Sequence, residues 1–238
     1  MPLILPSNSI SAGGYEVDNS LRFNPSSSDG LTRTTGTPTS RRIFTFSSWV
    51  KKADTDISDN QALFSISNPN GLYFIDIRFH HTNEQLEIID YQNGTQMFLR
   101  TNRVFRDPSA WYHIVVTVDT TNATADDRIK MYVNGVQETS FASRTNPSLN
   151  HDTSANETNT RVGYQYSQYY FDGYLAETVF IDGTALDPTS FGEFDADTGI
   201  WKPINVSGLT FGTNGFYLDF ENSGSLGADV SGNGNNLL

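Results

Sequence analysis

Residues 111–119 constrain the fold more than any other part of the sequence, because polar and apolar side chains alternate through most of the run. A period of two places Ile114, Val116 and Val118 on one face of an extended strand. An amphipathic helix would instead need apolar residues three and four positions apart. Residues 111–119 therefore predict a β-strand with one buried face.

A second alternating run follows at residues 128–133, with the apolar set Ile129, Met131 and Val133. Asn134-Gly135 comes directly after it, and both residue types tolerate the positive φ angles of a tight reversal. We expect the chain to turn back here toward residues 136–139. The two runs therefore predict an antiparallel sheet whose inner face carries both apolar sets.

Similar strand signals recur along the chain, separated by joints rich in Asn, Gly and Asp. They lie at residues 20–24, 43–52, 62–67, 72–80, 85–91, 96–101, 161–165, 169–182 and 215–220. Many short strands at this spacing favour an all-β, antiparallel two-sheet sandwich over a parallel α/β sheet. One short helical turn is expected near residues 187–194, where Asp187 can cap a turn that begins at Pro188.

The two ends of the chain differ from this central pattern. Residues 1–14 are apolar and then rich in Ser and Gly, with prolines at 2 and 6, so we expect an extended N-terminal arm. Residues 15–222 hold the strand signals as one domain, and residues 223–238 form either a C-terminal tail or a closing strand. Residues 140–160 are a long polar insertion, which predicts a variable loop.

Composition argues against several classes of function. The chain has 238 residues, no cysteine and a formal net charge of −12. The absence of cysteine excludes thiolate zinc sites and cysteine nucleophiles, and the acidic balance disfavours binding to nucleic acid or anionic lipid. No run approaches the roughly 18 apolar residues of a membrane span, and the first residues lack the basic start of a signal peptide. We therefore expect no nucleic acid partner and no membrane insertion.

Several motifs in a fixed order resemble a known family. They are Ser48-Trp-Val-Lys51, Trp111-Tyr-His-Ile-Val115, Tyr132-Val-Asn-Gly135 and Phe171-Asp-Gly-Tyr-Leu-Ala-Glu177. Together they resemble the laminin-G-like and pentraxin-like branch of the concanavalin A-type jelly rolls, which implies a jelly-roll sandwich. In many such domains an aspartate able to serve a structural calcium precedes the glutamate, whereas this chain has Ala176 there.

Further blocks give a closer resemblance, to virion proteins of tailed bacteriophages that carry such a domain. The blocks lie at residues 15–23, 106–113, 180–186, 191–195, 199–203 and 212–218. The resemblance implies a non-enzymatic structural or binding protein of the virion, assembled in the host cytoplasm as a capsid decoration, fibre or spike component. Its expected partners are other virion proteins and further copies of itself, because a virion site imposes symmetry. Attachment to host-surface glycans is an additional option.

A tyrosine-rich segment supplies the candidate carbohydrate-binding residues, which are Tyr164, Tyr166, Tyr169 and Tyr170. Exposed rings can stack on the C–H face of a sugar while neighbouring amides bond its hydroxyls. The alternative function is therefore a carbohydrate-binding module. The competing interpretation is that alternate tyrosines pack against the fold and only their hydroxyls reach the rim. Trp49 and Trp111 are interpreted as core or sheet-face anchors.

An acidic loop supplies the candidate metal ligands Asp54, Asp56 and Asp59. Three carboxylates in one loop are ligands that Ca²⁺ accepts, although the loop lacks the glycine and the closing glutamate of an EF-hand. A solvated loop without metal is the competing interpretation. No other cofactor is expected.

A second acidic run, Glu193-Phe-Asp-Ala-Asp197, bears on catalysis. Jelly-roll glycosidases place two carboxylates on one strand, and a pair about 5–5.5 Å apart suits a retaining mechanism. Here the run follows a helical turn and precedes Thr198-Gly199, so we expect an acidic surface turn and no catalytic residue. A glycoside hydrolase that uses Glu193 and Asp197 is the remote alternative.

Overall fold

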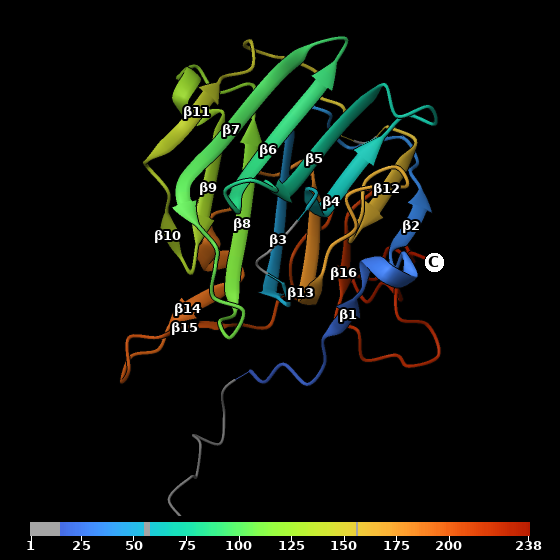
Figure 1. The fold of residues 1–238 in the computed structure, drawn as a ribbon, viewed down its shortest axis with the longest axis vertical. Coiled ribbons are helices and arrows are strands. Elements are labelled where there is room, and N and C mark those ends of the chain that lie inside the picture. The colour runs from blue at the N-terminus through green and yellow to red at the C-terminus, as the bar shows by residue number, and fades with distance from the viewer. Residues whose placement is uncertain (1–14, 55–57, 156) are drawn as a thin grey trace, which may run out of the picture.

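Two seven-stranded sheets, stacked face to face, form the body of the protein (Figure 1). The structure is a computed structural model, and it describes residues 15–54, 58–155 and 157–238. Sheet A has the order β1 (Leu21–Phe23), β13 (Gly173–Asp182), β3 (Ile43–Lys52), β8 (Tyr112–Asp119), β9 (Ile129–Val133) and β10 (Val136–Gln137), with β16 (Phe216–Leu218) paired to β13.

Sheet B has the order β11 (Phe141–Thr145), β7 (Thr95–Val104), β6 (Gln85–Gln92), β5 (Tyr73–Phe79), β4 (Gln61–Ser67), β12 (Asn159–Val162) and β2 (Leu31–Thr34). A small hairpin of β14 (Gly192–Phe194) and β15 (Trp201–Pro203) lies outside both sheets. The helical elements of the described residues are the 3₁₀ turns η1 (Pro25–Ser27), η2 (Ala125–Asp127) and η3 (Pro188–Ser190). The predicted all-β antiparallel sandwich is therefore confirmed.

One hydrophobic core fills the space between the two sheets. All six apolar residues predicted to face inward from residues 111–133 are buried in it. Phenylalanine rings join the sheets, since Phe64 of sheet B lies 5.0 Å from Phe46 and 5.0 Å from Phe180 of sheet A, measured between ring centroids. Aromatic pairs at this distance stabilise a core beyond the area that they bury.

The outer face of sheet A is also covered, so the prediction of one buried face is wrong for β8. Val115 and Val179 point outward from the sheet but pack in a second apolar cluster with Phe191, Val206 and Phe211. The chain between β13 and β16 supplies these last three residues as it crosses back over the sheet. Alternation along one strand could not show that a distant segment covers its second face.

His113 and Trp201 fasten this covering segment to sheet A. The Trp201 indole N–H donates to Nδ1 of His113 at 2.9 Å, and Nε2 of His113 lies 2.9 Å from Oγ of Ser47. Burial lowers the pKa of His113 to about 3, so the ring is neutral. Because Nδ1 accepts from Trp201, the single proton sits on Nε2 and is donated to Ser47.

Three boundaries differ from those expected from the sequence. The predicted loop at 140–160 contains edge strand β11, which pairs with β7. The predicted strand at 169–182 begins only at Gly173, and the helical turn ends at Ser190 before β14 begins. An edge strand pairs on one side only and can be largely polar. The sequence of β11 therefore resembles that of a loop.

The C-terminus lies beside β2, at the edge of sheet B. Leu237 is buried in the main core, and Leu238 exchanges two backbone hydrogen bonds with Thr32, at 2.9 and 2.8 Å. No strand is assigned within residues 223–238, yet these bonds tie the end of the chain to the sheet. Within the described ranges, no helix is long and apolar enough to cross a membrane.

Candidate functional site

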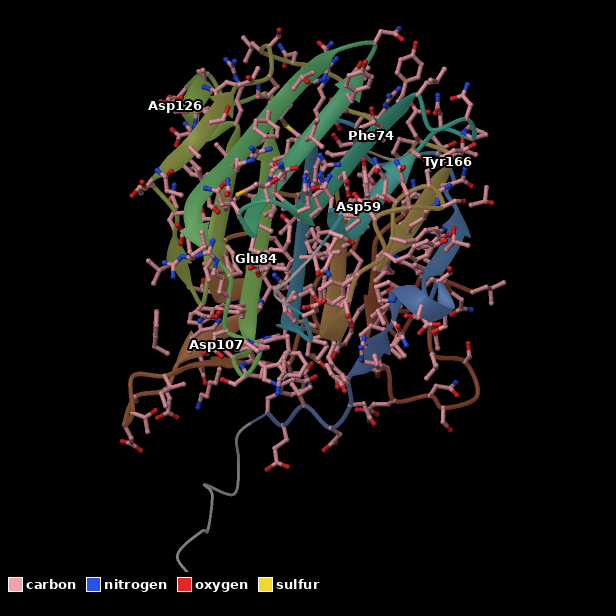
Figure 2. All side chains as sticks on the ribbon, viewed as in Figure 1. Asp59, Phe74, Glu84, Asp107, Asp126 and Tyr166 are labelled. Atoms are coloured by element: carbon pink, nitrogen blue, oxygen red, sulfur yellow. The ribbon has the colours of Figure 1, made fainter. Side chains whose placement is uncertain are left out.

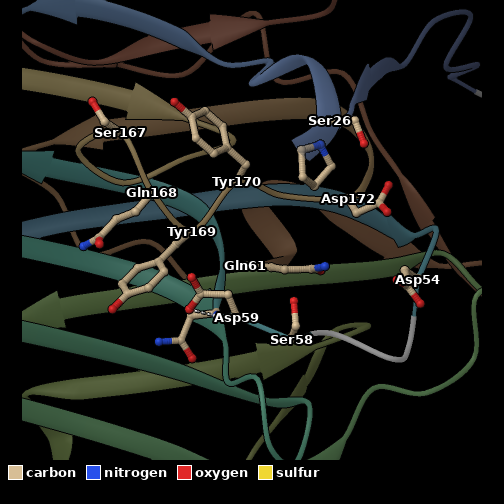
Figure 3. Close-up of a pocket in the computed structure, with 12 residues that line it drawn as sticks. Ser26, Asp54, Ser58, Asp59, Gln61, Ser167, Gln168, Tyr169, Tyr170 and Asp172 are labelled. Atoms are coloured by element: carbon tan, nitrogen blue, oxygen red, sulfur yellow. Dashed lines mark hydrogen bonds between the residues drawn. The ribbon is translucent and has the colours of Figure 1, made fainter.

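A pocket of about 470 Å³ lies where three segments of the chain meet (Figure 3). Residues 58–61, with Asp54, form one wall and lead into β4. Residues 167–170, with Asp172, form the second wall, and Pro25 with Ser26 of η1 completes the pocket. We call this site the hairpin pocket. Its size falls within the usual range of ligand sites, about 300–1,000 Å³.

A tight hairpin supports the second wall. Gln165 and Gln168 exchange two backbone hydrogen bonds, at 2.9 and 2.7 Å. The two residues between them, Tyr166 and Ser167, both have positive φ, at 30° and 62°. Asn-Gly is the usual sequence for such a turn, and a left-handed backbone costs about 1–2 kcal/mol at an ordinary residue. Strained backbone of this kind concentrates at functional loops.

The four predicted tyrosines fall into two groups. Tyr169 and Tyr170 line the hairpin pocket, whereas Tyr164 and Tyr166 do not. The rings of Tyr164 and Tyr170 are stacked, with centroids 5.4 Å apart and planes 6° apart, so Tyr164 supports Tyr170 from behind. Tyr166 is 41 % exposed and lies apart from Asp59, as Figure 2 shows.

A buried network of ion pairs on sheet B lies against the ring of Tyr169. The guanidinium of Arg78 lies 5.3 Å from the Tyr169 ring centroid. Arg78 also bonds Asp76 at 3.0 Å and Glu87 at 2.6 Å, and Arg100 bonds Glu87 at 2.6 Å. Burial raises the pKa of Asp76 to about 7, although Arg78 lowers it. This paired network fixes the ring from behind.

The acidic loop contributes to the pocket without forming a described metal site. Asp54 and Asp59 line the pocket, while Asp56 lies outside the described residues. Among the residues that the structure describes, no three His, Cys, Asp or Glu side chains are placed to hold an ion. A calcium ion bound by Asp54, Asp56 and Asp59 therefore stays a prediction.

Gln61 is a pocket residue that sequence reasoning missed. The residue is 5 % exposed, and its buried Oε1 has no hydrogen-bond partner among the described residues. Figure 3 shows the amide reaching between Asp172 and Ser58. An unpaired buried amide oxygen is costly, by about 1–3 kcal/mol, so its position calls for an explanation. The sequence signal was faint: one glutamine at the junction of a loop and a strand.

A second hollow, of about 290 Å³, lies on the outer side of sheet A. Trp49 and Trp111 line it together with residues 17–20, Ala176 and Pro203. Trp49 stacks on His113 with ring centroids 4.9 Å apart, and its indole N–H has no partner within the part of the chain that the structure describes. Trp111 is 37 % exposed. We call this site the tryptophan groove.

The acidic run considered for catalysis lies in the small hairpin, outside both sheets. Glu193 is on β14, and Asp195 and Asp197 follow in the turn toward β15. Lys202 contacts Glu193 at 3.3 Å and Asp195 at 3.0 Å. Asp195 also accepts the backbone N–H of Thr198 at 2.9 Å, and these bonds hold its pKa far below the usual range. The run therefore forms the end of β14 and the turn after it, and it lies on neither face of the two seven-stranded sheets.

The fold and these sites define a lectin-like jelly roll. The chain belongs to the concanavalin A-like lectin/glucanases superfamily, whose family model matches residues 25–189. No curated protein matches the sequence.

Solved structures similar to this chain come from several kinds of protein. Domains LG4–5 of the mouse laminin α1 chain are 11 % identical with a TM-score of 0.50, over 88 % of this chain and 50 % of that one. Tailspike protein 2 of Escherichia coli O157:H7 bacteriophage CAB120 is 10 % identical with a TM-score of 0.49, over 72 % and 23 %. The carbohydrate-binding module of the Ruminococcus gnavus IT-sialidase, bound to α2,6 sialyllactose, is 13 % identical with a TM-score of 0.44, over 66 % and 87 %. At these identities the likeness concerns the fold alone.

Proposed function

We propose that this chain is a non-enzymatic, glycan-binding jelly roll that holds a sugar in the hairpin pocket. The observation that carries the proposal is the position of Tyr169 and Tyr170 in a polar pocket, each ring supported on one side by packed residues. A sugar needs an aromatic ring for its C–H face and oxygen acceptors for its hydroxyls. Asp59, Asp172 and Gln61 supply the acceptors.

Two features support a binding role without catalysis. Glu193 lies on β14 of the small β14–β15 hairpin and Asp197 in its turn, and Lys202 pairs with both Glu193 and the intervening Asp195. Asp76 and Glu87 are the paired carboxylates on the face of sheet B, and both are fully buried beneath arginine side chains. A glycosidic bond could not approach them. Incubation with the glycans that bind should release no reducing sugar, and turnover that Glu193→Gln abolishes would establish the hydrolase instead.

We propose further that the protein is part of a tailed-phage virion, present in several copies and in contact with other virion proteins. The sequence blocks between residues 15 and 220 support this location. The glycans would then be those of the host surface. Mass spectrometry of purified phage particles should detect this protein. A reconstruction of the particle should then show where its copies lie. A monomer that binds no virion component and is missing from particles would contradict it.

A glycan array tests the binding function directly. The wild-type chain should bind a subset of glycans, and Tyr169→Ala should lose on the order of tenfold in affinity, because removing an aromatic ring that anchors a ligand typically costs more than about 1 kcal/mol. Tyr166→Ala is the matched control, since Tyr166 is on the same hairpin but outside the pocket. Equal losses in the two variants, or no signal from the wild type, would refute the assignment.

Calcium at Asp54, Asp56 and Asp59 is proposed as an accessory to this site. Calorimetric titration with CaCl₂ should then show binding that an Asp59→Asn variant weakens. Binding of glycans that is unchanged by a chelator would confine the ion to a role in loop stability.

A further inference from the structure

The charged side chains that line the hairpin pocket are all acidic, although Arg78 lies behind the Tyr169 ring. Asp54, Asp59 and Asp172 line it, and no lysine, arginine or histidine is found among its described lining residues. Arg22 pairs with Asp172 at 2.5 Å from outside the pocket, so part of that charge is offset. Asp59 is exposed and accepts the backbone N–H of Asn60 at 2.8 Å. The whole chain, these carboxylates included, has a formal net charge of −12.

Gln61 gives independent reason to expect a ligand among these carboxylates. Its amide is buried in the pocket wall and its oxygen has no partner among the described residues, where only Trp49, Asp76, Asn146 and Ser154 also have an unpaired buried side-chain atom. Rotation of the amide by 180° about its last bond presents either the oxygen or the NH₂ group to the pocket. A neutral amide can therefore bond a hydroxyl or an amine, but it cannot balance the charge of an anionic ligand.

We infer that the hairpin pocket selects sugars that carry no carboxylate, neutral or amino sugars, and rejects sialic and uronic acids. The inference rests on the proposed glycan binding and names its substrate class. Carboxylates accept hydrogen bonds from hydroxyls and attract an ammonium group. An acidic sugar would place a second negative charge against these carboxylates, and the described lining residues include no cation to pair with it. A site can exclude a close relative of its ligand by such repulsion. Asp59 is the specificity-determining residue, because Arg22 already offsets Asp172.

The size of the discrimination follows from Coulomb's law. A single charge repelled at about 5 Å in a partly solvated site changes affinity on the order of tenfold. The effect should decline with salt, because the Debye length falls from about 8 Å at physiological ionic strength to about 3 Å at 1 M. Recognition by ring stacking and neutral hydrogen bonds would change little over the same range.

Matched probes test the inference. Chitotetraose, its fully deacetylated form and tetragalacturonate supply a neutral, an amino and an acidic tetramer, and N-acetyllactosamine is compared with its sialylated form. On the full chain, affinities for the acidic members should be at least about tenfold weaker than for their uncharged counterparts. The ratio of the affinity for an uncharged glycan to that for its acidic counterpart should fall severalfold in Asp59→Asn. It should fall likewise for the wild type in 1 M NaCl, and the affinity for uncharged glycans should be retained in both cases. Asp126→Asn, which makes the same charge change far from the pocket, should leave the ratio unaltered.

The outcomes separate the inference from the function on which it rests. If sialylated or uronic glycans bind as tightly as their neutral counterparts, the inferred charge selection is wrong. The proposed glycan binding would still hold. Binding by none of the probes, nor by any glycan of the array, would refute both. If Asp59→Asn failed to fold, Asp54→Asn, which removes another carboxylate that lines the pocket, would serve in its place, and an unchanged ratio of acidic to neutral affinities in that variant would also count against the inference.

Discussion

The hairpin pocket and the tryptophan groove both present aromatic rings to solvent, but different parts of the structure hold those rings. In the tryptophan groove, Trp49 stacks on His113, which in turn bonds Trp201. In the hairpin pocket, Tyr169 and Tyr170 project from irregular backbone beside a strained turn. The first set of rings belongs to the packing of sheet A. The rings of the hairpin pocket are attached at the rim of the sandwich.

This difference separates rings that stabilise the fold from rings that are available to a ligand. Trp201 is nearly buried, and a Cβ placed on Gly135 would lie 2.4 Å from its ring, so the fit is close. The hairpin carries positive φ at Tyr166, Ser167 and Tyr169, which costs stability. A chain selected only to fold would have a relaxed turn there. The comparison therefore supports the proposal that a ligand binds in the hairpin pocket, and it indicates that the rings on the outer side of sheet A support the fold.

The largest effect is expected from Trp201→Ala, which should lower the free energy of unfolding by about 3–5 kcal/mol. The substitution removes a buried ring and leaves Nδ1 of His113 without its donor. Denaturant titration measures the change. Trp111→Ala, in the tryptophan groove, is the matched control and should cost less than about 1 kcal/mol, because its ring is partly exposed. Equal costs would contradict the structural role assigned to Trp201.

Asp76 should make stability depend on pH. Its pKa is raised in the folded state to about 7 from a reference value of 3.8. The folded protein therefore binds the proton more tightly than the unfolded chain does, so the contribution is fully present below about pH 4 and is lost as pH rises through about 7. The free energy of unfolding of the wild type, compared with that of Asp76→Asn, should fall across this window. If the free energy of unfolding depended on pH in the same way in both proteins, Asp76 would not titrate in this window.

Gln61→Leu should separate stability from binding. The substitution removes the unpaired amide at nearly constant volume, so the free energy of unfolding should stay the same or rise by up to about 1 kcal/mol. Glycan affinity should fall on the order of tenfold, because an amide that bonds the sugar is lost. Calorimetry with the best glycan of the array and thermal unfolding provide the two readouts. A variant that loses stability and keeps its affinity would assign Gln61 to the fold.

The smallest effect is expected in the turn itself. Replacing Tyr166-Ser167 with Asn-Gly should relieve the left-handed strain and raise the free energy of unfolding by about 1 kcal/mol, or the melting temperature by about 2–4 °C. Because the pocket's two rings are kept, glycan affinity should change by less than about threefold. A drop in stability would mean that contacts of Tyr166, such as its packing beside Arg161, outweigh the strain.

The sequence predicted the parts of the fold that depend on local pattern. Ile114 and its inward-facing neighbours were placed correctly, because alternation on a strand is set by backbone geometry. The covering of Val115 and the pairing of β11 were missed, since both depend on segments distant in sequence. In the candidate site the sequence named Tyr169, Tyr170, Asp54 and Asp59 but gave no indication that they share one pocket. That juxtaposition arises from the meeting of residues 58–61 and 167–172, which only the folded chain provides.

Nuclear magnetic resonance titration with the tightest glycan of the array tests the central claim most directly. Binding in the hairpin pocket should shift the backbone amide signals of residues 58–61 and 165–172 and leave the indole N–H signals of Trp49, Trp111 and Trp201 in place. Shifts confined to the indole signals would move the glycan site to the tryptophan groove and contradict the account.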